Sequence, residues 1–246
     1  MDQQSRGFNI IEQEYQKSQA MPVVKTFMAN VFAWMTAAMV ITSVTAYLFG
    51  TSAELISSLR SATGGMSGLG WIVMLAPIGF VLLMSMGFQR LSPAIMSLLF
   101  IAFSILMGMS LSFIFLVYTK TSIFQTFLIS GGMFGIMAAL GYTTKTDLTK
   151  FGSIMMMGLV GIFIAMMVNW FMHSETLAYL ISIGGVLVFT GLTAYDVQKL
   201  KKIGAGIGVA TGDPNARKLS ILGALTLYLD FINLFLFLLR IMGDRR

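Results

Sequence analysis

Two aspartates lie inside long apolar stretches of the sequence: Asp196 in ISIGGVLVFTGLTAYDVQKL and Asp230 in ILGALTLYLDFINLFLFLLR. A charge at a bilayer centre costs about 2.5–3.5 kcal/mol on insertion scales, so we expect each carboxyl group to titrate, pair or bind a cation. Two carboxyl groups in one site are expected to share a proton, because burial and like-charge repulsion both oppose the doubly charged state. Without that proton they would separate or attract a hard cation such as calcium, which prefers oxygen ligands.

The composition predicts a membrane protein, since 57% of the residues are hydrophobic, 11% are charged and the mean hydropathy is +0.83. Apolar spans of about 20 residues, long enough to cross a bilayer, are predicted near 26–49, 71–88, 92–118, 122–142, 152–172, 177–198 and 219–241. None shows the alternation of a membrane β-strand, and lipid-exposed backbone must close its own hydrogen bonds. The sequence therefore predicts an all-α membrane protein, a seven-transmembrane-helix bundle.

The expected domains are a polar, cytoplasmic N-terminal tail at 1–25, the transmembrane domain at 26–242 and a short basic tail at 243–246. With this orientation, 11 of the 16 basic residues face inward: Arg6, Lys17, Lys25, Arg90, Lys145, Lys150, Lys199, Lys201, Lys202, Arg217 and Lys218. The positive-inside rule favours that orientation. The basic residues Arg240, Arg245 and Arg246 fall outside, so either this tail is an exception or the last span re-enters instead of crossing.

Polar and small residues form one stripe on each aspartate-bearing span. At 100° per residue, Gly223, Thr226, Asp230, Asn233 and Arg240 share a sector about 100° wide, and Ser182, Gly185, Thr193 and Asp196 share one about 80° wide. We expect the two stripes to face each other, with Thr193, Thr226 and Asn233 supporting the carboxyl groups. Arg90 could latch a closed state by pairing with a carboxylate; alternatively, it is an interfacial arginine that snorkels.

Small residues four apart predict close helix packing in two further spans: Ser104, Gly108 and Ser112 in one, and Gly131 and Gly135 in the next. The glycine-rich joint at about 203–217 is expected to be a cytoplasmic loop in which Asp213 caps the next helix. No dinucleotide site is expected there, because no strand precedes the glycines.

Several classes of function are disfavoured. The chain has no cysteine and one histidine, which excludes thiolate metal sites and leaves no zinc-binding pair of histidines. The basic residues are dispersed over joints and tails, so nucleic acid is not an expected partner. No cofactor is expected; the expected partners are the lipid bilayer, calcium and protons, with other membrane proteins as a further possibility.

Three segments resemble the transmembrane Bax inhibitor motif family (Bax inhibitor-1-like), in particular its bacterial inner-membrane members: GYTTKTDL, GLTAYDVQKLKK and ILGALTLYLDFINLFLFLLRIMG. The resemblance covers nearly the whole chain from about residue 25. It implies a seven-helix bundle with the last helix central, and a pH-sensitive calcium leak gated by Asp196 and Asp230 with Arg90 as the latch. The 203–217 joint is longer and richer in glycine than in the smaller members of the family, and GFQRLSPA lacks a run of basic residues that some relatives carry.

Two alternatives to an ion leak remain. Intramembrane aspartyl proteases also place one aspartate on each of two helices, the first in a Tyr-Asp dipeptide such as Tyr195-Asp196. Here, however, Leu-Tyr-Leu precedes Asp230 where those enzymes have Gly-x-Gly, and a Pro-Ala-Leu turn is missing. The other alternative is a non-catalytic regulator that binds membrane proteins through its N-terminal tail or small-residue faces. The favoured hypothesis is a non-enzymatic, proton-controlled cation leak of the bacterial inner membrane.

Overall fold

The computed structural model describes the backbone of residues 2–61, 65–206 and 214–245, and the side chains in those ranges from residue 22 onward. Within these ranges the chain forms nine helices and no strand beyond two isolated β-bridges. The helices are α1 (Asp2–Thr51), α2 (Ala53–Ser58), α3 (Gly68–Met86), α4 (Pro93–Leu111), α5 (Ile114–Val117), α6 (Lys120–Thr143), α7 (Thr149–Met172), α8 (Glu175–Gly206) and α9 (Pro214–Met242). The predicted all-α fold is confirmed.

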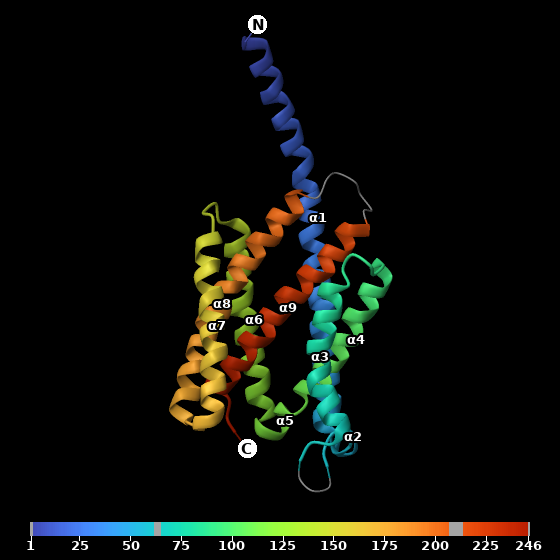
Figure 1. Cartoon of the computed structure of the whole chain (residues 1–246), viewed down its shortest axis with the longest axis vertical. Helices are drawn as coiled ribbons and strands as arrows, with labels where there is room; N and C mark the ends of the chain where they lie inside the picture. Colours follow the sequence, from blue (N-terminus) through green and yellow to red (C-terminus); the bar gives the residue numbers. More distant parts are fainter. Residues whose placement is uncertain (1, 62–64, 207–213, 246) are drawn as a thin grey trace.

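Seven spans in the described ranges are long and apolar enough to cross a membrane, as predicted: Pro22–Thr51, Gly68–Met86, Pro93–Val117, Lys120–Thr143, Thr149–Met172, Glu175–Gly206 and Pro214–Met242. Side chains at helix N-termini define several starts. Ser67, Ser92 and Thr119 each accept a hydrogen bond from a backbone N–H three residues later. The first helix extends beyond its span, because α1 is continuous from Asp2 through the segment expected as a polar tail (Figure 1). The expected cap Asp213 lies outside the described residues.

The last helix, α9, is the centre of the bundle, as the resemblance implies. In the most apolar 18-residue stretch of α9, 72% of the residues are buried, whereas in the corresponding stretch of α7 only 11% are buried. It packs against α8, α1, α6 and α4 (Figure 1). Tyr228 of α9 is fully buried against the rings of Phe100 and Phe103 of α4, and its hydroxyl lies 2.8 Å from Thr42 Oγ1 of α1.

The chain crosses the bundle in α9 and ends at the end opposite the start of α1 (Figure 1). The residues after α9 are fixed there. Asp244 accepts hydrogen bonds from the backbone N–H of Thr119 at 3.1 Å and from Ser122 Oγ at 3.1 Å. The continuous helix α9 is therefore against the re-entrant alternative, and an exceptional position of Arg240 and Arg245 under the charge rule stays a prediction.

The two predicted small-residue contacts differ. Gly108 packs closely as expected, because a Cβ there would lie 2.7 Å from the backbone carbonyl of Thr42. Gly131 and Gly135 do not, since a Cβ at either position would meet no atom within 4 Å. The expectation of close packing at these two glycines is wrong, because α6 contacts its neighbours through other faces.

Candidate functional site

The structure brings Asp196 of α8 and Asp230 of α9 together. Both side chains are buried, with 9% and 6% of their surface exposed, and the two carboxyl groups are within hydrogen-bonding reach of each other. Small residues allow the helices to approach: a Cβ on Gly185 would lie 2.5 Å from the Phe237 ring. Nearby, the rings of Phe189 and Phe237 stack with their centroids 5.8 Å apart.

One oxygen of this pair lacks a partner. Asp230 Oδ2 is buried and makes no hydrogen bond within the described part of the chain. Buried polar atoms are nearly always satisfied, so an orphaned carboxyl oxygen indicates a place for a proton, a water or an ion. A hydrogen bond between two carboxyl groups also requires a proton on one of them. The geometry therefore suits a pair of carboxyl groups that shares one proton.

The positive charge that acts on Asp196 is that of Lys199, one turn later on α8. Its Nζ lies 5.9 Å from the ring of Tyr195. Among the described residues, neither Asp196 nor Asp230 forms an ion pair with a basic side chain. Arg90 is exposed in the turn between α3 and α4, where its backbone N–H donates to the Gly87 carbonyl at 2.9 Å. The latch role of Arg90 therefore stays a prediction.

Lys218 is the basic residue that contacts the turn after α3 instead, and sequence reasoning missed it. Only 7% of its surface is exposed. Its Nζ donates to the backbone carbonyl of Phe88, just after α3, at 3.0 Å and lies 4.7 Å from the Phe88 ring. The sequence signal was its helical register with Ile221 and Leu225, which are both buried.

The polar stripe of α8 is buried as expected. Thr193 is fully buried, and its hydroxyl donates to the Phe189 carbonyl at 2.8 Å. Ser182 is likewise fully buried, so this face of α8 turns toward the bundle interior.

The stripe of α9 is inward only in part: Gly223 and Asp230 are buried, but the expectation for Thr226 is wrong. Thr226 and Arg240 are exposed and Asn233 is half-buried. Thr226 Oγ1 and Asn233 Nδ2 bond to carbonyls one turn back in their own helix, at 3.1 and 2.9 Å. The physical reason is that neighbouring helices pack on the large apolar residues of α9, where close contact gains the most dispersion energy. The uncovered face of α9 carries polar side chains, whose hydrogen bonds are made to backbone carbonyls of α9 itself.

Two of the segments that carry the resemblance meet at one end of the bundle. Gln198 Oε1 accepts a hydrogen bond from the Leu148 backbone N–H at 2.8 Å, and its Nε2 donates to the Thr146 carbonyl at 2.7 Å. Lys201 Nζ donates to the Tyr142 carbonyl at 2.7 Å. The turns of α8 that follow Asp196 are therefore bound to the connection between α6 and α7.

Comparison with known proteins agrees with this architecture. The family described as Bax1-I, inhibitor of apoptosis-promoting Bax1, matches residues 24–246. The chain is 46% identical over 223 residues to the inner membrane protein YbhL of Escherichia coli strain K12, covering 91% of this chain and 93% of that protein. It is 44% identical to an uncharacterised protein of Rickettsia prowazekii, covering 91% of each chain. It is 42% identical to a protein of Borreliella burgdorferi, covering 94% and 97%.

Proposed function

Since the chain belongs to the family of inhibitors of apoptosis-promoting Bax1 and is a multi-pass membrane protein, we propose that it is a pH-sensitive calcium leak of the bacterial inner membrane. Its N-terminus lies in the cytoplasm, and it catalyses no reaction. The observation that carries the proposal is the contact between the buried carboxyl groups of Asp196 and Asp230. The name of the Escherichia coli relative supports the location.

Gating follows from the number of protons on the pair. With one proton, the two carboxyl groups attract each other and hold α8 against α9. Without it, two unit charges about 4 Å apart repel by about 4 kcal/mol at an effective dielectric constant of about 20. An energy of this size shifts a two-state equilibrium by about three orders of magnitude. Lys199 offsets part of the repulsion, because it acts on Asp196.

Calcium suits the site as a permeating ion. It takes about six to eight oxygen ligands, of which two carboxylates supply only a part. Within the described ranges, no cluster of three acidic, histidine or cysteine side chains exists to complete a tight site. Water and backbone oxygens would supply the remaining ligands, which gives the weak binding that an ion needs in order to leave.

Calcium flux into liposomes tests this proposal. Purified wild type is measured between pH 6 and 8 beside Asp230→Asn and the Asp196→Asn/Asp230→Asn double variant. Asparagine keeps the shape of a protonated aspartate, so we expect the variants to lose the pH response. An unchanged pH profile in Asp230→Asn would overturn the gating role, and no flux above that of empty liposomes would overturn the leak.

The two rival functions give different results in the same preparation. An intramembrane protease would cleave a transmembrane reporter, and Asp230→Ala would abolish the cleavage. A regulator that binds other membrane proteins through its N-terminal segment would lose that binding when residues 1–20 are deleted, whereas a leak would keep its calcium flux. We expect no cleavage and full flux after the deletion.

A further inference from the structure

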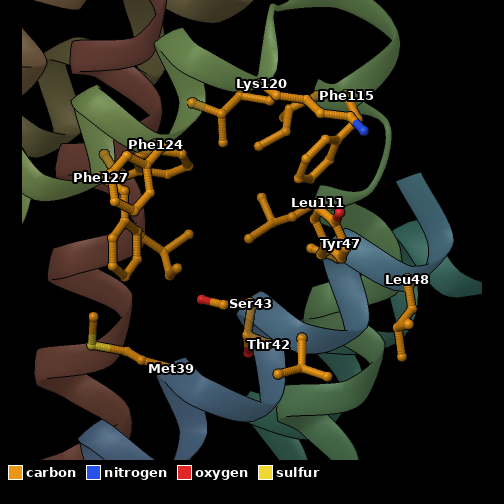
Figure 2. A pocket seen from close by; sticks show the side chains of 16 residues that line it. Met39, Thr42, Ser43, Tyr47, Leu48, Leu111, Phe115, Lys120, Phe124 and Phe127 are labelled. Carbon is orange, nitrogen blue, oxygen red and sulfur yellow. The ribbon is translucent and has the colours of Figure 1, made fainter. Parts of the chain in front are cut away.

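A groove runs between α1 and α6, with α9 as its floor. These two helices pack against α9 and little against each other. Two hollows of about 560 and 480 Å³ lie along this line, and Met39 borders both. We call them together the α1–α6 groove; Figure 2 shows the larger hollow. The groove is separate from the contact between Asp196 and Asp230.

The groove is apolar along its length. Aromatic side chains of α5, α6 and α9, including Phe115, Phe127 and Phe235, border the larger hollow. In the smaller hollow, Gly131 and Gly135 leave the backbone of α6 uncovered, with no atom within 4 Å of where a Cβ would stand. A long, narrow apolar surface of this kind matches an alkyl chain.

One charge lies on the lining of the groove. Lys120 is the only charged residue among the residues that border the two hollows. It begins α6, so it stands at the end of a membrane span, the level of lipid headgroups. Its Nζ lies 5.6 Å from the ring of Tyr47 and forms no ion pair in the part of the chain that the structure describes. Figure 2 shows the side chain of Lys120 at the edge of the larger hollow, beside Phe115.

We propose that the α1–α6 groove binds an anionic phospholipid, with an acyl chain along the groove and the phosphate at Lys120. Charge complementarity favours this occupant over a second copy of the chain. A copy related by a two-fold axis along the membrane normal would bring its own Lys120 to the same end and neutralise neither charge. The inference does not rest on the proposed ion flux.

Native mass spectrometry of the full-length protein with added phosphatidylglycerol or phosphatidylcholine tests the site. Lys120→Gln removes the charge, and Lys145→Gln, an exposed lysine of the α6–α7 connection, is its control. Gly135→Leu fills the groove, and Gly132→Leu is its control, because Gly132 also has open space but does not border either hollow.

We expect wild type and both controls to retain phosphatidylglycerol in preference to phosphatidylcholine. Lys120→Gln should weaken the retention of phosphatidylglycerol about fivefold, which is the factor that one lysine contributes to binding at an anionic lipid surface. Gly135→Leu should abolish the retention. Equal retention of the two lipids, or equal behaviour of Lys120→Gln and Lys145→Gln, would overturn the proposal. A two-copy mass that Gly135→Leu abolishes would show that a second chain occupies the groove. Should Gly135→Leu fail to fold, the lysine variants decide the result.

Discussion

Lys202 Nζ lies 2.7 Å from Asp147 Oδ1 and joins the last turns of α8 to the α6–α7 connection. Thr149 donates to the same oxygen from its backbone N–H at 3.1 Å and from its hydroxyl at 2.7 Å. The hydrogen bond from Lys202, followed by those from Thr149, holds the pKa of Asp147 well below its usual value. Both partners of the ion pair are largely exposed, so it contributes little to stability.

Asp147→Asn should leave the pH dependence of calcium flux between pH 6 and 8 unchanged. A carboxyl group whose pKa is lowered by folding stabilises the folded state above its unfolded pKa and loses that effect as the pH falls through its folded pKa. For Asp147 this window begins below the usual value of 3.8, far from the range of the flux measurement. Asp147→Asn is therefore a matched acidic control for Asp230→Asn. A flattened profile in Asp147→Asn would move pH sensing to the α6–α7 connection.

Lys218→Met should raise the resting flux more than Arg90→Ala. The helix α3 packs mainly against α4 and only slightly against α9, so the bond from Lys218 to the Phe88 carbonyl is a large share of its attachment to the centre. A charge-assisted hydrogen bond is worth about 1.5–3 kcal/mol, which is about tenfold or more in an open–closed equilibrium. Flux at pH 7 measures this. The opposite order of the two variants would contradict this prediction and support the latch role of Arg90.

Gly141→Ala should destabilise the protein, whereas Gly132→Ala should not. Both glycines lie within α6, where alanine is intrinsically better by about 1 kcal/mol. A Cβ at Gly141 would collide with the backbone carbonyl of Ala194 on α8, while one at Gly132 would meet nothing. Overpacking costs about 1–3 kcal/mol, or about 2–4 °C per kcal/mol for a chain of this size. Thermal unfolding in detergent measures the difference, and equal melting temperatures would contradict the contact.

The sequence predicts those features that depend on the length of its apolar runs and on the residue types within them. Long apolar runs predict the seven spans, and aspartates within two of them predict which helices carry the pair. The orientation of Thr226 and the open space at Gly131 were not predictable in this way, because they depend on which neighbour covers which face of a helix. The predicted span ends near Lys199, yet α8 continues to Gly206, where Lys201 bonds to Tyr142 in the last turn of α6 and Lys202 bonds to Asp147 in the α6–α7 connection.

The central place of α9 has a consequence for biosynthesis. Translation delivers the spans in sequence order, so the other six leave the ribosome before the helix around which they pack. Until α9 inserts, the inner faces of α1, α4, α6 and α8 lack their main common partner. We therefore expect the nascent chain to remain a loose set of inserted helices, vulnerable to membrane proteases, until α9 inserts and closes the assembly.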